Sequence, residues 1–131
     1  MDRPVIIWGA GKIGRGFIAE VFGRPGYQIT FVDMMRPLIE SLQSADGYTI
    51  WKAENTGVSS VRVEQYDALH IDDGVEIMRK MLGPNPIVSA AVHASMLESL
   101  ADMLAPYIRA RAMKTPDEPM DILLSVNQMM P

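Results

Sequence analysis

The chain has 131 residues, of which 48% are hydrophobic, and it carries a net charge of -4 with no cysteine. This length and composition suit one domain with a buried core, while the negative charge gives no electrostatic reason to expect nucleic acid or an anionic membrane as a partner. The lack of cysteine excludes disulfides and thiolate metal ligands, and no apolar run approaches the roughly 20 residues that a membrane span needs. We therefore expect a cytoplasmic protein without a metal site.

Short apolar runs alternate with amphipathic stretches along the chain, which is typical of strands that alternate with helices. In chain order the sequence predicts a strand at Val5–Trp8, a helix at about Ile13–Phe22, a strand at Gln28–Val32, a helix from Pro37 to Gly47, two antiparallel strands at Tyr48–Lys52 and Val58–Tyr66, a short helix capped by Asp72 or Asp73, a buried strand at Ile87–Val92, a helix opened by the capping box Ser95–Glu98 and kinked or divided at Pro106, and a strand at Ile122–Val126. This order predicts an α/β fold of the Rossmann type, with a doubly wound, mainly parallel sheet and helices on both faces. The pair around 48–66 is expected as a hairpin-like antiparallel excursion in place of a plain third βα unit.

The most informative segment follows the first strand, where residues 9–14 have the pattern G-x-G-x-x-G. In a turn of this kind Gly9 allows the tight bend and Gly11 lets the backbone approach a pyrophosphate, while Gly14 lets the helix pack close to the sheet. The helix N-terminus then faces the phosphates with its N–H groups and its dipole. Because strand, turn, helix, second strand and a terminal acid follow in order, the motif predicts a dinucleotide site more strongly than a turn that only packs a βαβ unit. The cofactor contacts predicted in this turn are Gly9, Ala10, Gly11, Lys12, Ile13 and Gly14.

Asp33 ends the second predicted strand, at the distance of about 20 residues from the glycine turn that a ribose-binding carboxylate requires. Its carboxylate can accept hydrogen bonds from the adenosine ribose hydroxyls and would repel a 2′-phosphate, so NAD is favoured over NADP. Arg36 leaves an alternative open. Its guanidinium could meet a 2′-phosphate, stack on adenine, or be a solvated side chain at a helix start.

The run from Gly9 to Ile18, with the sequence GAGKIGRGFI, resembles the N-terminal signature of the family of mannitol-1-phosphate, polyol and hexonate dehydrogenases. The resemblance covers essentially the whole chain and is looser between Trp51 and Asn85. Further matches in register are Thr30–Asp33, Ala91-Val92 with Leu97-Glu98, and Asp121–Asn127.

This resemblance implies the NAD-binding half of an enzyme that interconverts a sugar alcohol and a keto sugar, often phosphorylated, by hydride transfer and without a metal. It also implies a second, mostly helical domain that supplies a lysine as general acid and base. Because the chain stops at Pro131, we expect residues 1–131 to be the dinucleotide-binding domain of a longer enzyme, which alone would bind NAD weakly and turn over no substrate. A divergent stand-alone relative is the other interpretation.

Three residues are expected near the reacting end of the cofactor. By its position in the family motif, Asn127 resembles an asparagine at the end of a strand, where its amide would hold the reacting oxygen beside the nicotinamide; an asparagine in a turn before Pro131 is the alternative. The preceding Val126 replaces the acidic residue usual in the family, which leaves the exact substrate open. Ala91 and Val92 are expected to line the path to the nicotinamide.

Four basic residues or histidines have two interpretations or none. Lys12 could contact the pyrophosphate or be solvated, and Arg15 could neutralise phosphate charge or form a surface ion pair. His93 could relay a proton or be a half-exposed loop histidine. His70, in a predicted loop before a helix, is assigned no role.

Two classes of function therefore remain. The first is an NAD-dependent polyol or sugar-phosphate dehydrogenase, with a hexuronate reductase as a variant that shares the cofactor half. The second is a non-catalytic NAD-binding module that senses the cofactor or pairs with another chain. The sequence does not predict an oligomeric state.

Overall fold

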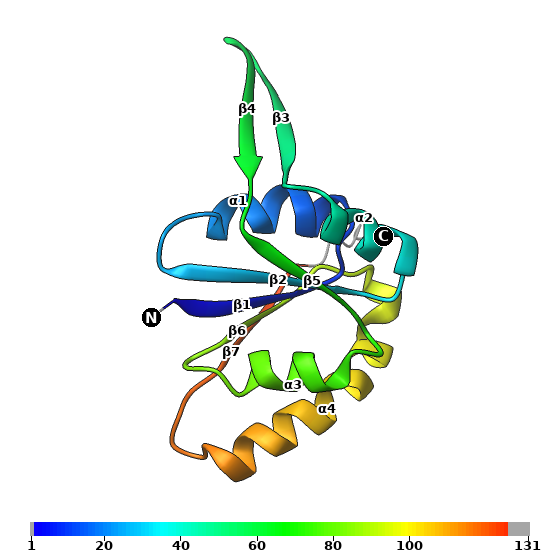
Figure 1. Cartoon of the computed structure of the whole chain (residues 1–131), viewed down its shortest axis with the longest axis vertical. Coiled ribbons are helices and arrows are strands. Elements are labelled where there is room, and N and C mark those ends of the chain that lie inside the picture. Colours follow the sequence, from blue (N-terminus) through cyan, green and yellow to red (C-terminus); the bar gives the residue numbers. More distant parts are fainter. Residues whose placement is uncertain (1, 126–131) are drawn as a thin grey trace.

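Five parallel strands form the central sheet of the computed structural model, which describes residues 2–125 (Figure 1). The chain leaves β1 for β2 and β5 on one side and returns to β6 and β7 on the other, so the strand order reverses beside β1. A reversal of this kind opens a crevice outside the carboxyl ends of the strands, where ligands bind in open α/β sheets. In spatial order the strands are β5 (Tyr66–His70), β2 (Tyr27–Asp33), β1 (Arg3–Trp8), β6 (Ile87–Ala90) and β7 (Asp121–Leu124).

Helices cover both faces of this sheet (Figure 1). One face carries the first helical segment and α2, and the other carries α3 and α4. The first segment begins as a π-helical turn, and a single 3-10 turn precedes α4. The bounds are η1 (Ile13–Ile18), α1 (Ala19–Phe22), α2 (Arg36–Ser44), α3 (Gly74–Met81), η2 (Ala94–Met96) and α4 (Leu97–Lys114). No helix of the described residues is long and apolar enough to cross a membrane.

The central strand β1 is buried on both faces, which explains its uninterrupted apolar sequence. Val5 and Ile7 pack with Phe31 in the cluster under α1 and α2. Ile6 and Trp8 point to the opposite side and pack in the cluster under α3 and α4. The period-two alternation of a strand thus fills two cores from one segment.

A separate antiparallel hairpin, β3 (Tyr48–Glu54) and β4 (Gly57–Val63), projects from the α1/α2 side (Figure 1). Two contacts attach its base to the first helical segment: the Tyr48 hydroxyl donates to the Arg15 carbonyl oxygen over 2.7 Å, and Lys52 pairs with Glu20. Its outer half stands clear of the sheet, with Trp51 and Val58 each 72% exposed.

The hairpin confirms the antiparallel excursion predicted around 48–66, but two details of that prediction are wrong. The run 58–66 is not one strand, because Gln65 adopts a positive φ of 57° and breaks the extended chain between Val63 and Tyr66. Tyr66 instead begins β5, which pairs in parallel with β2. The hairpin is therefore inserted before the third βα unit, β5–α3, and does not replace it.

Pro106 does not divide the last helix, which continues as α4 from Leu97 to Lys114. Proline removes one N–H donor, but Leu100 and Leu104 before it and Arg111 after it are buried against the rest of the domain and keep both halves in one helix. The predicted division is wrong because tertiary packing outweighs one missing hydrogen bond.

The edge strand β7 is partly exposed on both faces. Ile122 and Leu123 point to opposite faces, and both are more than two-fifths exposed. The strand was predicted at 122–126 and is observed at 121–124; Val126 lies outside the described residues.

Candidate functional site

The glycine turn lies where β1 leaves the sheet between the ends of β2 and β6. Gly9 has a φ of +105°, and its N–H donates to the Val32 carbonyl oxygen over 2.8 Å. A Cβ on Gly9 would lie 2.3 Å from the Ala91 carbonyl oxygen. Both the conformation and the space therefore require glycine, as predicted for the tight turn.

The other two glycines of the motif have opposite surroundings. A Cβ on Gly14 would lie 2.1 Å from the Gly9 carbonyl oxygen, so the helix passes directly against the turn, as predicted. A Cβ on Gly11 would meet nothing within 4 Å, and Gly11 is exposed. The fold of the described residues gives no reason for glycine at position 11. The empty space leaves the backbone open to approach at this position.

The first helical segment begins at this turn. Lys12 stands at its N-terminus, is exposed, and makes no side-chain hydrogen bond that would cap it within residues 2–125. The Arg15 Nε donates to the Gly11 carbonyl oxygen over 3.5 Å, and no ion pair involves Arg15 in the described part of the chain. Two positive side chains and the positive end of the helix dipole therefore lie beside the turn.

Asp33, at the carboxyl end of β2, connects the turn to the next helix. One carboxylate oxygen accepts the Ala10 N–H over 2.8 Å, and the other accepts the Met35 N–H, also over 2.8 Å. Each oxygen of an ionised carboxylate has a second lone pair, so Asp33 can still accept two further hydrogen bonds. The arrangement fixes an anion with spare acceptor capacity at the edge of the glycine turn.

The third wall of the site comes from the end of β6. The Ala91 N–H donates to the Trp8 carbonyl oxygen over 2.8 Å, and Val92 Cγ1 lies 3.1 Å from the position of a Cβ on Gly9. The structure therefore brings Ala91 and Val92 against the turn, opposite Asp33. Asn127 lies outside the described residues.

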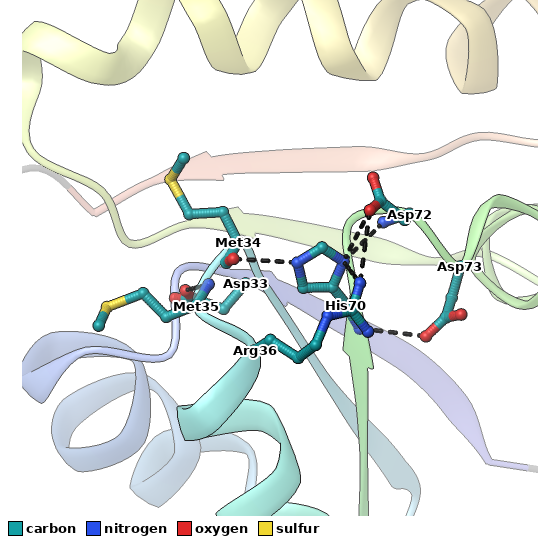
Figure 2. Close-up of polar contacts among 7 residues, drawn as sticks. All are labelled: Asp33, Met34, Met35, Arg36, His70, Asp72 and Asp73. Atoms are coloured by element: carbon teal, nitrogen blue, oxygen red, sulfur yellow. Dashed lines mark hydrogen bonds and ion pairs between the residues drawn. The ribbon is translucent and has the colours of Figure 1, made fainter.

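His70, to which the sequence pattern assigned no role, lies beside Asp33. It is the last residue of β5, not a loop residue, and its backbone is in register with Asp33 of β2. Its side chain is buried: Nε2 lies 2.9 Å from the Met34 carbonyl oxygen, and Nδ1 accepts the Asp72 N–H over 3.1 Å (Figure 2). Both hydrogen bonds form when the ring proton is on Nε2, because Nε2 then donates to the carbonyl and Nδ1 offers its lone pair to the N–H.

Arg36 reaches this histidine from the start of α2. Its Nη2 lies 3.2 Å from His70 Nδ1 and 3.4 Å from an Asp72 carboxylate oxygen (Figure 2). Arg36 is therefore the largely solvated side chain at a helix start that the sequence allowed, with 57% of its side chain exposed, and it also contacts His70 and Asp72. A short alternating run before two aspartates, at 66–70, was the available signal for a strand ending at His70.

His93 caps a helix. Its Nδ1 accepts the Ser95 N–H over 3.2 Å and lies 2.9 Å from the Ser95 hydroxyl oxygen. The predicted capping box at 95–98 is wrong, because the helical stretch begins at Ala94 with His93 as its N-cap, and the Ser95 hydroxyl contacts the imidazole.

Two observations concern what else the described residues could bind. They contain no group of three or more His, Cys, Asp or Glu side chains placed to hold a metal ion. A cavity of about 600 Å³ lies at the amino end of the sheet, lined by residues 22–27 and 62–65 among others, and the glycine turn takes no part in it.

Residues 3–130 match the family model described as the mannitol dehydrogenase Rossmann domain. The chain belongs to this family. The match confirms the predicted family and the NAD-binding Rossmann type of domain. Relatives include the mannitol-1-phosphate 5-dehydrogenases of Phaeosphaeria nodorum, 31% identical over 115 residues, and of Alternaria alternata, 30% identical over 115 residues. Each alignment covers 88% of this chain, and the chain spans about 30% of the length of these relatives.

A solved structure shares the fold. The crystal structure of RSP in complex with beta-NADH matches with a TM-score of 0.52 over 99% of this chain and 49% of that chain, at 13% sequence identity. This match agrees with the Rossmann architecture of the sheet and its helices.

Proposed function

We propose that this chain is the NAD-binding domain of an oxidoreductase that transfers a hydride between a nicotinamide cofactor and a sugar alcohol or sugar-phosphate polyol. The substrate pair would be of the mannitol-1-phosphate and fructose-6-phosphate type, as the names of the relatives suggest. The proposal depends most on the open space at Gly11. Gly9 and Gly14 are required by contacts within the chain, whereas a Cβ on Gly11 would meet nothing, and a ligand that approaches the backbone there would account for the glycine.

The residues present fit a dinucleotide. The N–H groups of the turn and the helix N-terminus would face the pyrophosphate, with Lys12 and Arg15 adding positive charge. Asp33 would accept hydrogen bonds from the adenosine ribose hydroxyls with its remaining lone pairs. Ala91 and Val92 would border the path to the nicotinamide, which, when bound, supplies the hydride chemistry.

We further propose that the active enzyme has a second domain, which would contribute the group that handles the substrate proton. The partly exposed apolar side chains on both faces of β7 support this, since exposed apolar surface next to a sheet edge favours a covering segment. The absence of cysteine fits the reducing cytoplasm, where we place the enzyme. Asn127, by its motif position, would hold the reacting oxygen.

Calorimetric titration of the 131-residue chain with NAD and with NADP tests the proposal. We expect binding of NAD with a dissociation constant well below that of NADP, and no oxidation of mannitol-1-phosphate by the chain alone. Failure of the folded chain to bind either nucleotide would refute the cofactor assignment. Robust turnover would refute the need for a second domain.

A further inference from the structure

Arg36 lies three residues after Asp33 in the sequence, but its guanidinium is directed toward the end of a different strand (Figure 2). Its two contacts are His70, which ends β5, and Asp72 in the turn that follows. The positive charge is therefore held on the β5 side of the crevice.

His70, which contacts the Arg36 guanidinium, is fixed in orientation. Nε2–H donates to the Met34 carbonyl and Nδ1 accepts the Asp72 N–H, so the ring cannot turn over without losing both hydrogen bonds. The side chain is also buried, with only 8% of the residue exposed. The single Nδ1 lone pair thus keeps its place in the folded chain, where the Asp72 N–H and the Arg36 guanidinium share it.

The three carboxylates drawn in Figure 2 have different partners. Asp72 pairs with Arg36, whereas Asp33 and Asp73 accept backbone N–H groups. A free arginine close to the ribose is what accommodates the 2′-phosphate of NADP in Rossmann domains. Here that arginine is already paired with Asp72 and hydrogen-bonded to His70.

We propose that Asp72 and His70 are positioning residues for cofactor choice: they hold Arg36 away from the ribose, so that the chain prefers NAD over NADP by more than the repulsion from Asp33 provides. This inference rests on the proposed function, because it assumes that Asp33 marks the ribose position. It assigns the specificity to the end of β5 as well as to the end of β2.

The test measures the ratio of the NADP to the NAD dissociation constant by calorimetry for the wild type and Asp72→Asn. The side chain of Asp72 is largely exposed and the substitution is nearly isosteric, so the variant should fold. We expect the ratio to fall about threefold to fivefold, the size of effect that an exposed charge pair produces. Asp67→Asn is the matched control, because Asp67 is an exposed partner of Lys80 at the other end of the same strand, and its ratio should stay at the wild-type value.

Removing the Asp72 charge also weakens direct repulsion of a 2′-phosphate, and a double-mutant cycle separates the two effects. In the Arg36→Gln background, Asp72→Asn should change the ratio less than about twofold, because no guanidinium is left to release. A second variant, His70→Gln, keeps an N–H donor for the Met34 carbonyl but removes the Nδ1 acceptor, and it should lower the ratio in the same direction as Asp72→Asn.

The outcomes distinguish this inference from the function on which it rests. If the wild type binds neither nucleotide, the proposed function fails, and this inference fails with it. If the wild type prefers NAD and the ratio is unchanged in Asp72→Asn, or changes equally with and without Arg36, the positioning role is refuted while the proposed function stands.

Discussion

The two glycines Gly9 and Gly11 offer a matched pair of substitutions, because alanine at one should damage the fold and alanine at the other should damage only ligand binding. Gly9→Ala places a Cβ on a residue with φ +105° and 2.3 Å from the Ala91 carbonyl oxygen. The left-handed backbone costs about 1–2 kcal/mol for a residue with a side chain, and moving the end of β6 costs about 1–3 kcal/mol more. We expect Gly9→Ala to lose about 2–5 kcal/mol of unfolding free energy, a large share of a typical domain's stability.

Gly11→Ala adds the same methyl group where nothing lies within 4 Å. Its unfolding free energy should stay within about 1 kcal/mol of the wild type, with a gain more expected than a loss because alanine restricts the unfolded chain. The added Cβ would stand where a pyrophosphate approaches the backbone, so the NAD dissociation constant should rise about tenfold or more, equivalent to about 1.4 kcal/mol.

Urea unfolding measured by fluorescence suits the first quantity, because Trp8 is 2% exposed and directly precedes Gly9, and calorimetry with NAD gives the second. Far-ultraviolet circular dichroism provides a control for intact secondary structure. The reasoning is refuted if Gly11→Ala binds NAD as tightly as the wild type, or if it unfolds as easily as Gly9→Ala.

Three further substitutions test other parts of the account. Asp33→Asn keeps one acceptor oxygen but removes the charge. We expect NAD to bind about tenfold more weakly in calorimetry, because hydrogen bonds to a charged group are lost. Unchanged affinity would exclude Asp33 as the ribose ligand. Arg111 is 3% exposed and donates to three carbonyl oxygens around the end of α3 and the loop before β7. Arg111→Met should therefore lower the unfolding free energy by about 3 kcal/mol, against about 0.5 kcal/mol for the exposed control Arg109→Met. Equal effects of the two substitutions in urea unfolding would show that these contacts contribute nothing to stability. Burial raises the pKa of Tyr48 above its usual 10.0. The folded chain therefore keeps this proton to a higher pH than the unfolded chain does. The resulting stability is present below about pH 10 and declines as the pH rises further. Tyr48→Phe should lose about 1 kcal/mol of unfolding free energy at neutral pH, because the hydrogen bond to Arg15 is absent. The unfolding free energy of the variant should also decline less steeply than that of the wild type between about pH 9 and pH 11. An equally steep decline would assign the alkaline loss of stability to other groups.

The glycine turn and its acidic partner could be predicted because their evidence is contiguous in the sequence. Gly9 and Gly14 follow a buried strand and open a helix, and each is required by a backbone contact that the motif describes. Asp33 closes an apolar run whose parallel neighbour is β1. Local pattern and tertiary structure agree in this region.

The bounds of β5 could not be predicted in the same way. The strand starts after Gln65, which has a positive φ, a conformation that a residue other than glycine rarely adopts and that no local pattern indicates. The meeting of Arg36 with His70 depends on the parallel register of Asp33 with His70, which is a long-range property of the sheet. Likewise, the buried residues on both sides of Pro106 outweigh the local signal for a helix break.

The place where nucleotide binds decides whether the glycine turn is the cofactor site. In a titration of the ¹⁵N-labelled chain with NAD, we expect the largest shifts at the amide signals of residues 9–14, with those near Asp33 and Ala91. Shifts gathered instead at residues 22–27 and 62–65, around the cavity at the amino end of the sheet, would contradict this assignment.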